Sequence, residues 1–265
     1  MIISNRTFIV SGGISGLGLA TAKAIVAQGA RVALLDRNED LGREVSSSQF
    51  EPASARFYCV DVTDADDIER VVGEASRWAA DAGYPLGGCV CAAGVAFAST
   101  TLDSSGDPAS IDTFKSVVDI NLIGSYALAT FVASSLAHQP PLESEPDHER
   151  GAIVLVSSVA GLEGQKGQAA YGASKGGVAS LVLPLARDLA RWGIRVNAIA
   201  PGVFETPMAG PMPNRVKQKL VSQLEFPQRF GQPEEFADVV LALFRNGMLN
   251  GTVIRLDGAT RMGKI

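Results

Sequence analysis

The chain is 265 residues long, carries a formal net charge of −5 and is 46% hydrophobic. A chain of this size buries roughly 70–75% of the surface of its unfolded form, so it needs neither disulfides nor metal ions to fold. The acidic balance argues against a surface that binds nucleic acid directly, and no run reaches the 18 or more apolar residues expected of a membrane helix. One domain spanning 1–265 suffices for this length.

Apolar and helical patterns alternate along the whole chain. The apolar runs predict strands at 6–10, 31–35, 55–60, 87–92, 152–157, 194–199 and 252–256. The segments between them predict helices at 16–28, 38–47, 64–81, 112–137, 171–192, 214–224 and 234–245. This alternation predicts an α/β fold, a doubly wound parallel sheet of Rossmann type with about seven strands and helices on both faces.

The position of the first strand bears on location in the cell. It begins almost at the N-terminus, which leaves no room ahead of it for a secretory or transit peptide. We therefore expect a soluble cytoplasmic protein, with a mitochondrial location as the alternative.

A glycine-rich segment follows the first predicted strand. Gly12, Gly16 and Gly18, with Ser15 and Leu17 between them, lead into the helical pattern. Glycines at this place allow the backbone to approach a phosphate closely, and the N-terminus of the following helix attracts a pyrophosphate. The spacing differs from the plain G-x-G-x-x-G pattern, so this segment predicts a dinucleotide site only in combination with other motifs.

Asp36 ends the second predicted strand, about 20 residues beyond the glycines, where an acidic residue reads the ribose diol of NAD. Its carboxylate would repel the 2′-phosphate of NADP, whereas Arg37 could pair with that phosphate. Because the glycine segment holds no Lys or Arg, we favour NAD as the cofactor, with NADP as the alternative.

The cysteine and histidine residues offer no metal site. Cys59, Cys89 and Cys91 lie in apolar, strand-like segments, which is typical of buried, inert thiols. Cys89 and Cys91 share one face of their strand but lack the neighbouring His or Cys that zinc requires. His138 and His148 flank a loop rich in Pro and Glu, where we expect them to be solvated, so no Ser-His-Asp triad is predicted.

Tyr171 and Lys175 stand four residues apart in a predicted helix, with Ser158 upstream. Side chains at this spacing lie on one face of a helix. A free phenol has a pKa of about 10, and the ammonium of Lys175 is expected to lower the pKa of Tyr171. Such a phenol can exchange a proton with a carbonyl or alcohol oxygen, which Ser158 could hold by a hydrogen bond. Gln165 and Leu162 lie between Ser158 and Tyr171, so both are expected to line a substrate pocket.

Three segments break the regular alternation. Residues 98–110 are rich in Ser, Thr and Asp, and residues 138–150 are predicted to form a surface loop. Residues 203–231 contain Met208, Met212, Phe226 and Phe230, an apolar character that suits a flexible lid over a hydrophobic substrate. The alternative is an ordinary helix packed on the core.

The motifs all follow predicted strands. In a parallel sheet, ligands bind beyond the carboxyl ends of the strands, at the point where the strand order reverses. One rim of the sheet is therefore expected to gather the segment 12–18, Asp36, Asp61, Gly94, Ser158 and Pro201.

The ordered motifs resemble those of the short-chain dehydrogenase/reductases over nearly the whole chain. The resemblance rests on the glycine spacing, Asp61 and Val62, Asn121, the set Ser158, Tyr171 and Lys175, and Pro201, Gly202 and Thr206. Within that family, the segments 163–171, 200–204 and 249–262 look like those of type-2 3-hydroxyacyl-CoA dehydrogenases, a group also described as 17β-hydroxysteroid dehydrogenase type 10.

The resemblance implies a role for each matching residue. Tyr171 would be the general acid/base, with Lys175 as its electrostatic partner and Ser158 orienting the substrate oxygen. Asn121 would help to hold a water-linked proton path to Lys175. The implied cofactor-binding residues are Gly12, Ser15, Gly16, Leu17, Gly18, Asp36, Asp61, Val62, Ala92, Gly94, Tyr171, Lys175, Pro201, Gly202, Phe204 and Thr206.

Two departures from the family pattern stand out. Where the family often has Asn-Asn-Ala-Gly after the fourth strand, this chain has Cys91, Ala92, Ala93 and Gly94. The missing Asn side chains put the bracing of that strand in question. Ser11 replaces the usual Thr and keeps its hydroxyl.

The leading interpretation is an NAD-dependent oxidoreductase that interconverts a secondary alcohol and a ketone. The resemblance points to a 3-hydroxyacyl-CoA or a hydroxysteroid as the substrate and to a homotetramer built on the helices at 112–137 and 171–192. One feature argues against acyl-CoA, because its phosphates favour cations at the pocket mouth, whereas residues 98–112 offer Asp103, Asp107 and Asp112 and no basic side chain. Lys166 and Arg215 could supply those cations instead.

Two alternatives stay open. The first is a specialised ketone reductase, or a 3-oxoacyl reductase, that uses NADPH. The second, of another class, is a non-catalytic scaffold subunit of an RNA-processing complex. The intact set Asn121, Ser158, Tyr171 and Lys175 argues against lost catalysis, and the acidic net charge argues against direct RNA binding.

Overall fold

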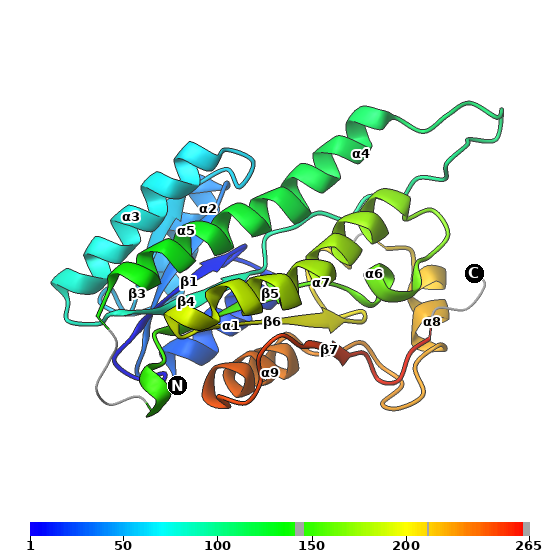
Figure 1. Ribbon diagram of the computed structural model, residues 1–265. Coiled ribbons are helices and arrows are strands. Elements are labelled where there is room, and N and C mark those ends of the chain that lie inside the picture. The colour runs from blue at the N-terminus through cyan, green and yellow to red at the C-terminus, as the bar shows by residue number, and fades with distance from the viewer. Residues whose placement is uncertain (141–145, 211, 262–265) are drawn as a thin grey trace.

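Seven parallel strands form a single sheet in the computed structural model, which describes residues 1–140, 146–210 and 212–261 (Figure 1). Along the chain they are β1 (Thr7–Ser11), β2 (Arg31–Asp36), β3 (Ala55–Cys59), β4 (Leu86–Cys91), β5 (Gly151–Val156), β6 (Ile194–Pro201) and β7 (Val253–Leu256). Their order in the sheet is β3-β2-β1-β4-β5-β6-β7. The order reverses between β1 and β4, and ligands bind such sheets at this switch point.

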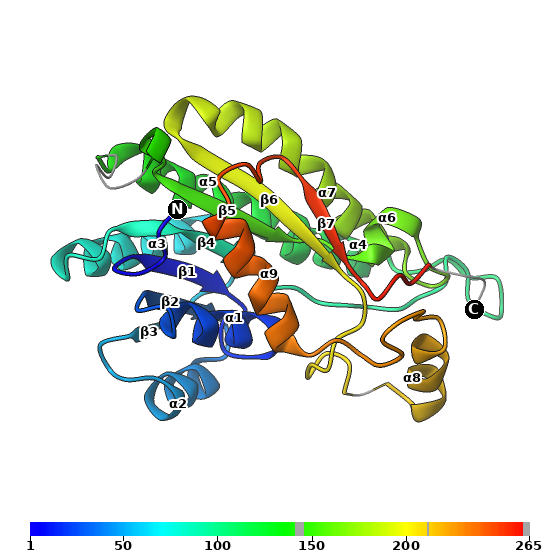
Figure 2. The same cartoon turned by 90° about the horizontal axis from the view of Figure 1, so that it is seen from below.

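Helices cover both faces of the sheet (Figures 1 and 2). One face carries α3 (Ala65–Asp81), α5 (Gly124–His138) and α7 (Ala169–Leu189), and the other carries α1 (Gly16–Val26), α2 (Glu39–Gln49) and α9 (Pro233–Arg245). Beyond the carboxyl ends of the strands lie α6 (Val159–Glu163) and α8 (Asn214–Val221). In β1, Phe8 and Val10 pack into one layer and Ile9 into the other, so the central strands are apolar on both faces, as expected.

Each predicted strand and helix is present, with ends displaced by a few residues. The largest difference lies in the predicted helix 112–137. It consists of α4 (Ile111–Val118), a π-helical turn (Asp119–Ile123) and α5, so the π turn places Asn121 inside a continuous helical segment. Such turns change the direction in which side chains leave a helix, and they occur frequently at functional sites.

The continuous helical segment 111–138 is long and apolar enough, by length and composition alone, to cross a membrane. The expectation that no run of the chain has this character was therefore wrong. The physical reason for the composition is packing, because Leu128, Val132 and Leu136 of α5 are buried in the core layer formed with α3 and the sheet.

The cysteine prediction is confirmed for two residues and wrong for one. Cys89 and Cys91 are buried in β4, with their Sγ atoms 3.9 Å apart. Cys59 is exposed. It ends β3, which is the edge strand and has β2 as its sole neighbour in the sheet, so one side of the strand end is left to solvent.

Two of the irregular segments are surface features. Residues 98–110 form an arm that extends away from the body of the molecule beyond α4 (Figure 1). Of the predicted loop 138–150, residues 141–145 lie outside the described residues; His138 and His148, which flank that gap, are exposed as expected.

Candidate active site

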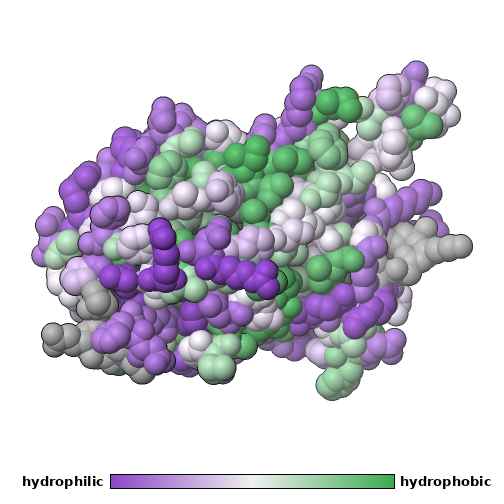
Figure 3. Space-filling model, viewed as in Figure 1, coloured by the Kyte–Doolittle hydropathy of each residue, from purple (hydrophilic) through white to green (hydrophobic). Residues whose placement is uncertain are grey.

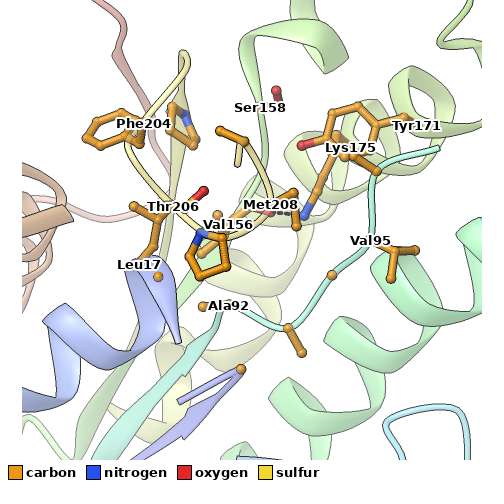
Figure 4. A pocket seen from close by; sticks show the side chains of 18 of the residues that line it. Leu17, Ala92, Val95, Val156, Ser158, Tyr171, Lys175, Phe204, Thr206 and Met208 are labelled. Atoms are coloured by element: carbon orange, nitrogen blue, oxygen red, sulfur yellow. Dashed lines mark hydrogen bonds between the residues drawn. The ribbon is translucent and has the colours of Figure 1, made fainter. Parts of the chain in front are cut away.

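A pocket of about 980 Å³ opens at the carboxyl ends of the strands (Figure 4). With the exception of Asn121 and Leu162, all the site residues predicted from the sequence line it: Gly12, Ser15, Gly16, Leu17, Gly18, Asp36, Asp61, Val62, Ala92, Gly94, Ser158, Gln165, Tyr171, Lys175, Pro201, Gly202, Phe204 and Thr206. Leu162, which was expected beside Gln165, is instead exposed and does not line the pocket. It lies on α6, whose packed side is formed by Val159 and Ala160.

The glycine segment joins β1 to α1 by a turn that leaves no room for side chains. Gly12 and Gly16 have φ values of +64° and +49°, a region that glycine adopts without strain. A Cβ on Gly18 would lie 2.2 Å from the carbonyl oxygen of Gly12. Ser15 caps α1 without a side-chain hydrogen bond, so the first backbone N–H groups of α1 can bind an anion.

Small residues allow the segment after β4 to contact the glycine segment after β1. A Cβ on Gly12 would lie 2.9 Å from the backbone nitrogen of Ala93, so the two segments touch through their backbones. The hydroxyl of Ser11 accepts a hydrogen bond from that nitrogen at 3.2 Å. This contact braces the segment in which the Asn side chains of the family pattern are missing.

Two carboxylates follow β2 and β3 at the far end of the pocket. Asp36 accepts a hydrogen bond from the backbone of Asn38 at 3.1 Å. Asp61 accepts two from Thr63, from the backbone N–H at 2.9 Å and from the hydroxyl at 2.8 Å. These hydrogen bonds, aided by the charge of Arg37, lower the pKa of Asp61. The lowered pKa favours the ionised carboxylate of Asp61, which accepts hydrogen bonds.

Ser158, Tyr171 and Lys175 meet at the middle of the pocket (Figure 4). Tyr171 and Lys175 lie one turn apart on α7, and Ser158 caps α6. The Ser158 oxygen accepts a hydrogen bond from the backbone of Ala160 at 3.2 Å, which leaves the hydroxyl proton free for a second partner. The arrangement therefore offers one hydroxyl donor and one phenol to the same oxygen atom.

Burial determines the titration of this group more than the charge of Lys175 does. The pKa of Lys175 is lowered from 10.5 to about 8, because burial disfavours the ammonium. Its Nζ donates to the carbonyl of Val156 at 2.7 Å and lies 6.0 Å from the centre of the Tyr171 ring. Burial raises the pKa of Tyr171, and the neighbouring Ser158 hydroxyl lowers it in part. The prediction that Lys175 lowers the pKa of Tyr171 was therefore wrong.

Asn121 lies behind the pocket and is fully buried. Its amide group forms a pair of hydrogen bonds with the backbone of Val95, at 2.8 and 2.9 Å, and donates to the hydroxyl of Ser174 at 3.0 Å. It thereby ties the segment after β4 to α7, next to Lys175. These contacts give Asn121 a positioning role, and its part in a proton path stays a prediction.

Comparison with known proteins agrees with this geometry. The family model described as enoyl-(acyl carrier protein) reductase matches residues 12–259. A curated relative, 3-hydroxyacyl-CoA dehydrogenase type-2 of Bos taurus, is 43% identical over 96% of this chain and 94% of its own length. A crystal structure of 3-hydroxyacyl-CoA dehydrogenase type-2 from Mycobacterium avium is 37% identical, with a TM-score of 0.89 and 99% of each chain covered.

A crystal structure of a short-chain dehydrogenase/reductase from Brucella melitensis covers 98% of both chains, with 26% identity and a TM-score of 0.84. The chain belongs to the short-chain dehydrogenase/reductase family. It is an oxidoreductase that acts on CH–OH groups and uses a nicotinamide cofactor. The cradle formed by Gly12, Gly18 and the open N-terminus of α1 fits the pyrophosphate of such a cofactor.

In this short-chain dehydrogenase/reductase, the two ends of the segment 203–231 pair with each other through Phe204 and Gly231, a junction that we call the neck. Phe204 pairs with Gly231 in an isolated parallel bridge, closed by hydrogen bonds of 2.9 and 3.0 Å. Phe204 is buried and packs edge-on against Phe236 of α9. Between the two ends of the neck, α8 has no buried residue. The segment is therefore an excursion fixed at its base, with a helix that does not belong to the core.

Several lining residues were not identified from the sequence. Val95, Ala98, Met208, Met212, Val216, Lys219 and Leu220 all line the pocket. Met208 and Met212 belong to the segment 203–231, whose apolar character was noted. Val95 and Ala98 follow β4 and carry no motif. The lining residues of α8 could have been found through the spacing of four between Arg215 and Lys219 and between Val216 and Leu220.

Proposed function

We propose that the protein is an NAD-linked dehydrogenase that interconverts a 3-hydroxyacyl-CoA and the corresponding 3-oxoacyl-CoA. The observation that carries this proposal is the convergence of Ser158 and Tyr171 on one pocket whose lid side is apolar, with Met208, Met212 and Leu220 in its lining. An acyl chain fits such a lining. The relatives named as 3-hydroxyacyl-CoA dehydrogenases support this choice of substrate.

The roles of the side chains follow from their surroundings. Tyr171 takes the hydroxyl proton in oxidation and returns it in reduction, while the cofactor supplies the acceptor or donor of hydride. Ser158 donates its free proton to the substrate oxygen and fixes that oxygen beside the phenol. Lys175 places a positive charge behind the phenol, and Asn121 holds the backbone at Val95 against α7.

The preference for NAD rests on Asp36. Its carboxylate ends β2 at the adenosine end of the pocket, where it can accept hydrogen bonds from a ribose diol and would repel a 2′-phosphate. The neighbouring Arg37 also lines the pocket. It supports the alternative, a ketone or 3-oxoacyl reductase that uses NADPH.

Substrate and cofactor are tested together in one panel. Oxidation of NADH and of NADPH is followed with acetoacetyl-CoA, a ketosteroid and a simple ketone. We expect turnover of acetoacetyl-CoA with NADH to exceed every other combination by at least about tenfold, since one interaction of about 1.4 kcal/mol produces that ratio. Turnover of the ketones alone, or with NADPH alone, would move the protein to the reductase alternatives. A complete lack of turnover would favour the scaffold.

We further propose that the protein is a homotetramer. Hydrophobic surface is visible over the helices on the face shown in Figure 3. The exposed large apolar side chains of α4, the π-helical turn, α5 and α7 are Ile111, Phe114, Ile123, Tyr126 and Leu183. Contiguous exposed apolar surface of this kind marks interaction sites. Light scattering should give a mass of about four chains of 27.7 kDa, and a monomeric mass would contradict the proposal.

A further inference from the structure

The charged residues that line the pocket lie in three places. Asp36, Arg37 and Asp61 lie at the ends of β2 and β3, and Lys175 lies in the middle. The remaining two charged lining residues are Arg215 and Lys219, both on α8. Among the described residues, no carboxylate from the segment 203–231 lines the pocket. The lid side of the pocket is therefore positive.

Both cations of α8 are available to a ligand. Arg215 and Lys219 are exposed and lie one helical turn apart, so their side chains leave the same face of α8. Within the described part of the chain, neither has an ion pair or a side-chain hydrogen bond. Their neighbours on that face, Val216 and Leu220, also line the pocket. This side of α8 therefore combines an apolar wall with two free positive charges.

The acidic arm does not oppose these cations at the pocket. Of residues 98–110, Ala98 alone lines the pocket. Asp103 accepts hydrogen bonds from the backbones of Ser105 and Asp107 at 2.7 and 3.0 Å, inside the arm itself. Asp112 pairs with Lys115 on α4 at 3.7 Å. The acidic side chains of the arm therefore do not line the pocket, and they give no reason there to exclude an acyl-CoA.

We propose that Arg215 and Lys219 form the subsite for the phosphate groups of the CoA moiety. This inference rests on the proposed acyl-CoA reaction and adds the residues that select a phosphorylated thioester. CoA carries several negatively charged phosphates at the end of the long arm that bears the thioester. Two cations one turn apart on the lid side of the pocket can bind such phosphates. Lys166, the other cation considered, is exposed but does not line the pocket.

The test compares two thioesters that differ in their phosphates. Steady-state kinetics are measured with acetoacetyl-CoA and with acetoacetyl-N-acetylcysteamine, which is neutral. For Arg215→Ala/Lys219→Ala, we expect KM for the CoA thioester to rise about tenfold relative to KM for the neutral one. Lys217→Ala is the matched control, because Lys217 lies on α8 but does not line the pocket. Added salt should raise KM for acetoacetyl-CoA in the wild type more than in the double variant.

Three results would overturn the subsite. The first is an equal rise of KM for both thioesters, which would make α8 a general part of the lid. The second is a weaker NADH affinity of the double variant in a fluorescence titration, which would assign the cations to the cofactor. The third is a tenfold effect with an acyl-carrier-protein thioester and none with CoA.

A binding measurement separates this proposal from the proposed function. Free CoA is titrated into the NADH complex of the wild type and of the double variant by calorimetry. If no thioester is turned over but CoA binds about tenfold more weakly to the double variant, the proposed reaction is wrong and the subsite stands. Equal CoA affinity of both proteins, or no binding to either, overturns the subsite.

Discussion

Tyr171→Phe is expected to lower kcat by about 10²–10⁴-fold, the contribution of a positioned general acid or base. The variant keeps the ring and removes the hydroxyl next to Ser158, the group proposed to transfer the proton. NADH affinity should stay within about twofold, because the phenol is one of many groups that line the pocket. Stopped-flow turnover and NADH fluorescence titration measure the two quantities on the same protein.

Tyr58→Phe is the matched control for this substitution. The Tyr58 hydroxyl is buried, has no hydrogen-bond partner among the residues that the structure describes, and lies outside the pocket. The same chemical change there should leave kcat unaltered and leave stability equal or slightly higher, because an unsatisfied buried hydroxyl is removed. If Tyr171→Phe kept near-normal turnover, the proton would have to pass through another group, and the assigned role would be wrong.

Gly18→Ala is expected to weaken NADH binding and to lower kcat/KM by about 10²-fold, since displacements of about 1 Å in a binding site have effects of this size. The added Cβ would lie 2.2 Å from the Gly12 carbonyl oxygen and 3.2 Å from the Cα of Gly13. Both neighbours are backbone atoms, so α1 or the preceding turn must move. That motion displaces the N–H groups that would face the pyrophosphate.

Gly73→Ala provides the control for Gly18→Ala. Gly73 lies in α3, and the nearest atom to an added Cβ is the end of the flexible Arg77 side chain at 3.6 Å. This variant should bind NADH normally and gain up to about 1 kcal/mol of stability from the better helix former. Unchanged NADH affinity of Gly18→Ala would show that the turn is no part of the cofactor site.

The strands were predictable because the central ones are buried on both faces. Phe8, Ile9 and Val10 form a continuous apolar run, and such runs bounded by turns have few other structural solutions in a chain of alternating pattern. The position of the site, at one rim of the sheet, could be predicted from the parallel arrangement of the strands. Once each strand is followed by a crossover helix, all carboxyl ends lie on one edge, and the residues after them converge.

The prediction was poorest where the environment of a side chain depends on segments distant in the chain. The pKa of Tyr171 depends on burial, which raises it, and on the Ser158 hydroxyl at the start of α6, and the Tyr-Lys spacing reveals neither. Cys59 lies in a strand-like segment like Cys89, but its strand is at the edge of the sheet. Whether a strand lies at the edge or in the centre of the sheet depends on the strand order, and the local sequence pattern does not reveal that order.

By itself, the sequence determined the class of fold and the order of the elements, since these depend on local periodicity and on turns at strand ends. Its resemblance to a family supplied the motif residues of the pocket, but not the residues of α8 that line it. Only the tertiary structure decided which charges face that pocket. Asp103 of the arm is close in sequence to the segment after β4 yet accepts hydrogen bonds within the arm, whereas Arg215 and Lys219 line the pocket. The neck between Phe204 and Gly231 anchors the segment that carries α8, and this pairing joins residues far apart in the chain.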